Sequence, residues 1–140
     1  MRWIKSEGLE TFPIWNLENV NGEELWLFEG IFDAMCVENG VCLFGVGFGE
    51  EIQEKIDNKK FTKIVVVMDN DIAGFNAKYK IAKILFEKGY DVYIYNYKGI
   101  SETYKDFNEM KICNIPYEFH NRVIPYNFKT EVLIKMGKIK

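Results

Sequence analysis

The stretch Lys63–Gly74, KIVVVMDNDIAG, decides the fold. Five apolar residues run from Ile64 to Met68, and Asp69 and Asp71 follow with one asparagine between them. An unbroken Val/Ile run is typical of a parallel strand that helices cover on both faces. Ligands of open α/β sheets bind beyond the carboxyl ends of such strands. The stretch therefore predicts a buried strand that brings two carboxylates to the edge of a sheet where ligands bind.

Strand patterns alternate with helical patterns around this stretch. Other strands are predicted at Glu24–Phe28, Val41–Val46 and Asp91–Tyr97. The intervening helices are predicted at 31–40, after the Gly47-Phe48-Gly49 turn, and at 72–88 before Gly89. Strands that alternate with helices form mainly parallel sheets with right-handed crossovers. We expect an α/β, Rossmann-like fold with a four-stranded sheet in the order 2-1-3-4 and helices on both faces.

That strand order places several acidic residues at one edge. The first and third strands become neighbours, so Glu29 faces Asp69 and Asp71 across the crevice where the topology switches direction. Asp33 lies one helical turn after Glu29, and Asp106 follows the fourth strand on a predicted loop. The predicted fold therefore brings five carboxylates together.

Such a gathering of like charges points to a bound cation. Neighbouring carboxylates oppose each other's ionisation, whereas hard divalent cations keep them ionised and prefer oxygen ligands. Mg²⁺, or Mn²⁺ in its place, is the expected cofactor, with two or more ions in the cleft. Paired ions of this kind stabilise the attacking and leaving oxygens in phosphoryl transfer.

Composition narrows the class of protein. The 140 residues carry a formal net charge of −3, which argues against a strongly basic nucleic-acid module but leaves room for a local basic patch. Three cysteines without a C-x-x-C pair, and one histidine, exclude a disulfide framework and a structural zinc site. The start of the chain has no signal-peptide pattern, and no apolar run reaches the roughly 20 residues that span a bilayer, so we expect a cytoplasmic protein without a membrane partner.

Three segments are expected along the chain. Residues 1–23 form a lead-in that packs on the domain, 24–110 form the domain itself, and 111–140 form a basic C-terminal extension. In the extension, Phe128, Val132, Leu133 and Met136 align on one side of a helix predicted after Pro125.

Three acidic motifs occur in a fixed order: EGIFDA at 29–34, DNDIAG at 69–74 and KDFNE at 105–109. This series resembles the Toprim domain, which type IA and II topoisomerases, bacterial-type primases, OLD-family nucleases and RNase M5-like proteins share. The resemblance covers roughly Glu24–Met110 and is nearest to the primases of bacteria and of bacteriophage primase-helicases.

The resemblance implies a role for each acid. Glu29 matches a glutamate that binds metal or acts as acid and base, and Asp69 and Asp71 match the metal-binding pair. These three are the expected catalytic residues. Asp33 and Asp106 match acids that hold additional ions in primases.

The expected partners are DNA, RNA or both, together with nucleoside triphosphates for a primase. Lys78, on the helix after the acidic stretch, and Lys105 are candidate contacts to phosphate. The chain contains neither a zinc module nor the G-x-x-x-x-G-K-[ST] motif of a helicase motor. A template-binding partner subunit or a helicase is therefore expected.

Three functions remain open on the sequence alone. A primase-type domain or subunit would synthesise RNA primers for DNA replication. A standalone nuclease would use the same acids to hydrolyse DNA or RNA phosphodiesters. A non-catalytic module would only bind nucleic acid or a partner, although the intact acids Glu29, Asp69 and Asp71 argue against it.

Overall fold

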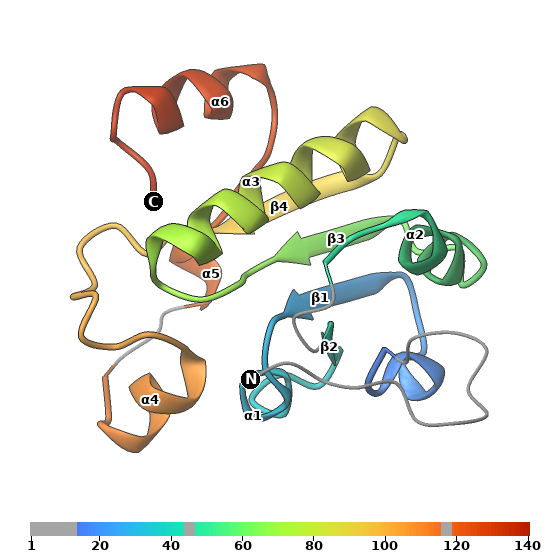
Figure 1. Ribbon diagram of the computed structural model, residues 1–140, viewed down its shortest axis with the longest axis horizontal. Helices are drawn as coiled ribbons and strands as arrows, with labels where there is room; N and C mark the ends of the chain where they lie inside the picture. The colour runs from blue at the N-terminus through green and yellow to red at the C-terminus, as the bar shows by residue number, and fades with distance from the viewer. Residues whose placement is uncertain (1–13, 44–46, 116–118) are drawn as a thin grey trace.

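A computed structural model describes residues 14–43, 47–115 and 119–140 (Figure 1). The elements run η1 (Leu17–Asn19), β1 (Glu24–Phe28), α1 (Ile31–Ala34), β2 (Gly40–Cys42), α2 (Glu50–Asp57), β3 (Lys63–Val66), α3 (Ile72–Glu87), β4 (Asp91–Tyr95), α4 (Phe107–Ile112), α5 (Phe119–Arg122), β5 (Val123–Pro125) and α6 (Phe128–Lys135). The predicted lead-in lies outside the described residues up to position 13, as do positions 44–46 of the predicted second strand.

The sheet has the order β2-β1-β3-β4-β5. The first four strands are parallel, so the predicted order 2-1-3-4 is confirmed. β5 adds an antiparallel fifth strand beside β4, which the sequence analysis missed because this short segment, with a proline at its end, has no clear strand period. Leu27 of β1 pairs with Val66 of β3, so the carboxyl ends of β1 and β3 lie side by side.

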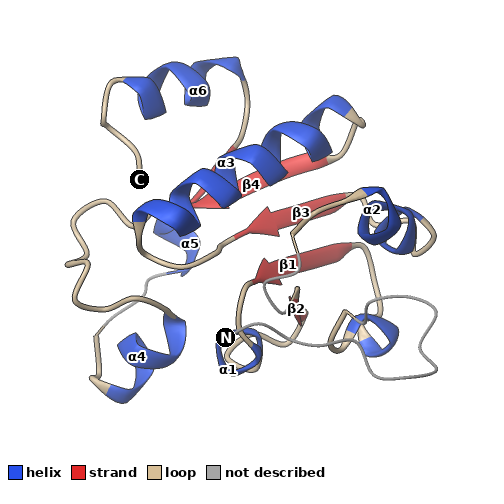
Figure 2. Cartoon of the chain, viewed as in Figure 1, coloured by secondary structure: helices blue, strands red, loops and turns tan. Residues whose placement is uncertain are grey.

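Helices cover both faces of the sheet (Figure 2). The β1-α1-β2 connection moves toward one edge, whereas the connections through α2 and α3 move in the opposite direction. Because parallel crossovers are right-handed, α1 lies on one face, and α2 and α3 lie on the other. The reversal of direction between β1 and β3 makes this point the switch in the topology.

Two apolar clusters form the core, one on each face. The larger contains the alternate residues Leu25 and Leu27 of β1, together with the buried sides of α2 and α3. The smaller packs α1 and α4 through Ala34, Phe107 and Met110. β3 contributes to both clusters, and its residues Ile64, Val65 and Val66 are fully buried, as its unbroken apolar run predicts.

Several predicted boundaries are wrong. α1 spans four residues rather than ten, and β4 ends at Tyr95 rather than Tyr97. The acidic motif at 105–109 was predicted as a loop, but it begins α4, because Asp106 accepts a hydrogen bond from the Glu109 N–H and so caps the helix.

The C-terminal helix is present, but its predicted apolar side is not its buried side. Phe128, Val132 and Met136 are exposed. Leu133, the remaining residue of the predicted side, packs against the core together with Ile134. None of the helices among the described residues has the length and apolar character needed to cross a membrane.

Candidate metal site at the carboxyl edge of the sheet

The turn after β3 presents Asp69 to the edge of the sheet. Met68 has a positive φ of 54°, and its carbonyl accepts a 2.6 Å hydrogen bond from the buried Tyr97 hydroxyl. The chain therefore bends sharply out of the strand direction directly before Asp69. The Asp69 N–H then donates to Glu29 Oε1 at 3.3 Å, which ties the end of β3 to the end of β1.

Asp71 begins α3. Its Oδ1 accepts a 2.7 Å hydrogen bond from the Gly74 N–H, so it is the N-cap of the helix. Gly74 has no room for a side chain, because a Cβ there would lie 2.1 Å from the Asp69 carbonyl oxygen. The close approach of the first turn of α3 to Asp69 therefore requires glycine at position 74.

Asp33 and Asp106 are brought together by the packing of α1 against α4. Asp33 lies in α1 and is 6% exposed. Its Oδ1 accepts a 3.0 Å hydrogen bond from the Asn108 N–H in the first turn of α4. Asp106, the N-cap of that helix, accepts from the Glu109 N–H at 2.8 Å.

Asp33, Asp69 and Asp106 form an aspartate trio. One carboxylate oxygen from each residue lies within 4.8 Å of the other two. Two ligands on opposite sides of one Mg²⁺ would lie about 4 Å apart, since each Mg–O bond is about 2.1 Å long. The all-oxygen donor set and its spacing therefore fit a hard divalent cation. Asp33 and Asp106 each also use one oxygen to accept a backbone hydrogen bond, from the Asn108 and Glu109 N–H groups.

The trio is electrostatically strained without a cation. Burial and the charges of Glu29, Asp33, Asp106 and Asp71 raise the pKa of Asp69 to about 8. Burial and the nearby Asp106 and Glu29 also raise the pKa of Asp33 to about 7, although the Asn108 N–H opposes this shift. A bound cation would oppose both shifts, because it stabilises the ionised carboxylates.

Glu29 and Asp71 stand beside the trio and are called the flanking pair here. Burial and the charge of Asp71 raise the pKa of Glu29, although the Asp69 N–H partly offsets them. A small cavity of about 170 Å³ borders Glu29 and is otherwise lined by apolar residues and a glycine: Leu43, Gly47, Met68, Ala73, Ala77 and Ile81. The sequence predicted that five carboxylates converge at this edge; in the structure Asp33, Asp69 and Asp106 meet within 4.8 Å, and the charges of Glu29 and Asp71 also act on Asp69.

Asn70 is a site residue that the sequence analysis missed. It is fully buried, and its Nδ2 donates to the carbonyls of Ser101 and Tyr104 at 3.1 and 2.9 Å. Its backbone N–H donates to the Lys105 carbonyl. These bonds attach the turn that carries Asp69 to the loop that leads into Asp106. The sequence signal was only a polar residue between two aspartates, which does not distinguish a buried clamp from a solvent-exposed turn.

The structure corrects the prediction that Lys78 contacts phosphate. Lys78 is fully buried, and its Nζ donates to the Tyr95 carbonyl at 2.8 Å among the rings of Phe75, Tyr79 and Tyr97. Burial lowers its pKa to about 7. Lys105 is exposed beside the site, and its role as a phosphate contact stays a prediction.

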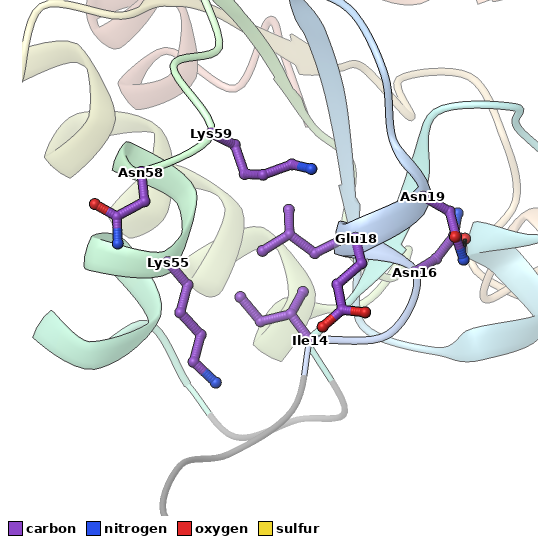
Figure 3. Close-up of a pocket in the computed structure, with 8 residues that line it drawn as sticks. Ile14, Asn16, Glu18, Asn19, Lys55, Asn58 and Lys59 are labelled. Atoms are coloured by element: carbon purple, nitrogen blue, oxygen red, sulfur yellow. Dashed lines mark hydrogen bonds between the residues drawn. The ribbon is translucent and has the colours of Figure 1, made fainter.

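A larger hollow lies between η1 and α2 (Figure 3). It measures about 530 Å³, and charges of both signs surround it, from Glu18, Lys55 and Lys59. Neither the trio nor the flanking pair lines it. The larger hollow and the candidate metal site are therefore separate places on the protein.

Comparison with known proteins gives a family match. The model of the Toprim-like family matches residues 26–111, more than half of the chain and the part that carries the acidic site. An uncharacterized protein of Mycoplasma pneumoniae, the MG010 homolog, is 30% identical over 91 residues, which are 61% of this chain and 42% of that protein.

A solved structure has a similar fold. The crystal structure of the zinc-binding and RNA polymerase domains of the Aquifex aeolicus primase matches with a TM-score of 0.51 and 20% identity, over 83% of this chain and 29% of that chain. The present chain thus spans less than half the length of either protein.

Proposed function

The chain belongs to the Toprim-like family, and from this premise we propose that it is the catalytic module of a metal-dependent, primase-type nucleotidyltransferase. The observation that carries the proposal is the convergence of Asp33, Asp69 and Asp106 within 4.8 Å, at the switch point of the sheet and beside Glu29. Asp33 is buried and the other two are half-buried, and carboxylates this close oppose one another's ionisation unless a cation joins them.

The trio would hold the first Mg²⁺ or Mn²⁺ ion, and the flanking pair would complete a second site or act on protons. The ions would neutralise charge on phosphate oxygens and activate the attacking hydroxyl. Asp71 keeps one oxygen on the Gly74 N–H, so its second oxygen is the one available to a ligand.

Glu29 is suited to proton transfer. Its pKa is raised by burial and by the charge of Asp71, and a raised pKa makes a carboxylate a stronger base. In the proposed reaction, Glu29 accepts the proton of a ribonucleotide 3′-hydroxyl as that oxygen attacks the α-phosphorus of the next nucleoside triphosphate. The bond from that phosphorus to the bridging oxygen breaks, and pyrophosphate leaves.

The proposed substrates are nucleoside triphosphates and a DNA template, and the product is a short RNA primer. A template-binding subunit or a helicase is a proposed partner. The Aquifex aeolicus protein supports the primase assignment at the level of the fold. Hydrolysis of DNA or RNA is the second candidate reaction, because the same carboxylates would orient water as readily as a hydroxyl.

One gel distinguishes these reactions. The purified chain is incubated with Mg²⁺ or Mn²⁺, single-stranded DNA, RNA and labelled ribonucleotides, with Asp69→Asn as the inactive control and Asp91→Asn as a control at the other end of the sheet. New short oligonucleotides that only Asp69→Asn abolishes would support the proposal. Shortened input strands would instead support the second candidate reaction, hydrolysis by a nuclease. If neither new oligonucleotides nor shortened strands appear, autonomous catalysis by this chain is contradicted.

A further inference from the structure

The helix α6 has a second apolar side that covers nothing in the described protein. Thr130, Leu133 and Ile134 lie on its inner side and are buried or partly buried. Phe128, Val132 and Met136, spaced four residues apart, are 79%, 43% and 62% exposed and are called the outer stripe here. Residues four apart on a helix lie on one side, so the outer stripe is continuous along α6.

Lysines border the outer stripe. Lys129 and Lys135 of α6 lie along its two edges, and both are exposed. Lys135 also lines a groove between α3 and α6 of about 370 Å³, together with Tyr79, Lys80, Lys83, Tyr126, Glu131 and Ile134. Figure 1 shows α6 beside α3 at the outer margin of the fold.

These lysines form no ion pairs with the described residues. Within the described ranges, none of the four lysines at positions 80, 83, 129 and 135 takes part in an ion pair. The neighbouring Glu131 carboxylate already accepts a 2.7 Å hydrogen bond from the Tyr126 hydroxyl. The four lysines therefore outnumber the two carboxylates near Tyr126, Glu87 and Glu131, so the surroundings of α6 are net positive while the chain as a whole is negative at −3.

We infer that the outer stripe docks an acidic amphipathic helix of a partner protein. The partner's apolar side would pack on Phe128, Val132 and Met136, and its carboxylates would face the bordering lysines. Apolar anchors one turn apart are the pattern by which one helix recognises another. Single-stranded nucleic acid fits less well, because bases stack on aromatic rings and the outer stripe offers only Phe128.

The test uses a designed peptide as the probe. An 18-residue peptide with leucines on one side and glutamates on the rest is titrated into the ¹⁵N-labelled full chain, and a second peptide replaces every glutamate with lysine. Saturable shifts of amide resonances at 126–138 with the acidic peptide, and binding at least about tenfold weaker with the basic one, support the inference.

Variants locate the contact. Val132→Glu, and separately Lys129→Glu combined with Lys135→Glu, should each weaken peptide binding at least about tenfold. The matched charge reversal Lys59→Glu with Lys111→Glu should leave binding unchanged. All these side chains are at least partly exposed, and circular dichroism confirms that each variant folds.

Four outcomes would overturn the inference. They are absence of saturable shifts at α6, equal binding of both peptides, binding of an oligothymidylate that the same variants weaken instead, or dimerisation of the chain through α6. Asp69→Asn should not change peptide binding, so this test stands apart from the proposed catalytic function.

Discussion

The aspartate trio and the flanking pair are both acidic, yet the structure assembles them differently. Asp33, Asp69 and Asp106 come from α1, the end of β3 and the cap of α4, so only tertiary packing brings them together. Asp71 is positioned by α3 alone, since one of its oxygens caps that helix. Capping a helix accounts for Asp71, whereas the trio joins one buried and two half-buried carboxylates from separate elements, an arrangement that a cation would stabilise even though Asp106 also caps a helix.

The largest effect on metal binding should come from Asp69, because the charges of the other four acids all act on its carboxylate. Asp69→Asn should weaken Mg²⁺ binding about 100-fold or more, because it removes a charged ligand at the centre of the site. Isothermal titration calorimetry measures the change. Asp91→Asn, at the start of β4, should bind like the wild type, and equal loss in both variants would contradict a local site.

Replacing one residue of the trio and one of the flanking pair distinguishes the roles of the two groups. Asp33→Asn should weaken Mg²⁺ binding about 10- to 100-fold, since the trio would lose a ligand. Glu29→Gln should change the affinity less than about threefold but lower the turnover number about 10²- to 10⁴-fold, the range for a lost general base. If Glu29→Gln weakened Mg²⁺ binding more than Asp33→Asn did, the assignment of the metal to the trio rather than to the flanking pair would be wrong.

Gly74 links the two groups, because the first turn of α3 packs on the Asp69 carbonyl. Gly74→Ala should lower the free energy of unfolding by about 1–3 kcal/mol, since the added methyl group overlaps that oxygen and must displace Asp69. At Gly49, at the start of α2, an added Cβ meets no atom within 4 Å. Gly49→Ala should therefore change the free energy of unfolding by no more than about 0.5 kcal/mol. Urea unfolding compares the two variants.

The pH dependence of stability should also distinguish the trio. Asp33 and Asp69 have pKa values raised to about 7 and about 8, whereas an unfolded aspartate titrates near pH 4. The folded state therefore holds these protons more tightly. The contribution of these protons to the free energy of unfolding is complete below about pH 4 and is lost as the pH rises from about 4 to about 8.

Asp69→Asn mimics the protonated carboxyl and serves as the reference for that effect. In EDTA, its melting temperature should exceed that of the wild type by a margin that grows from pH 5 to pH 8, and Mg²⁺ should remove the margin by stabilising only the wild type. A margin that is constant over this pH range would contradict the raised pKa values.

Local patterns predicted much of the fold. The apolar run before Asp69 identified β3 as a buried strand. Alternation of strands with helices predicted the order of the four parallel strands once the chain was taken to start in the middle of the sheet and to switch direction once. Those features depend on residues close together in the chain and on the handedness of crossovers. The short β5 and the cap that begins α4 escaped prediction, because neither has a long enough period.

The sequence by itself determined which acids occur, their order, and the sheet edge to which they belong. Only the tertiary structure decided their grouping, because Asp33 reaches Asp69 and Asp106 through the packing of α1 on α4 and through the buried clamp of Asn70. It also decided that Lys78 is buried among aromatic rings and that the outer stripe of α6 is exposed. Which side of a helix is buried depends on what packs against it, and a helical period with apolar residues on two sides does not contain that information.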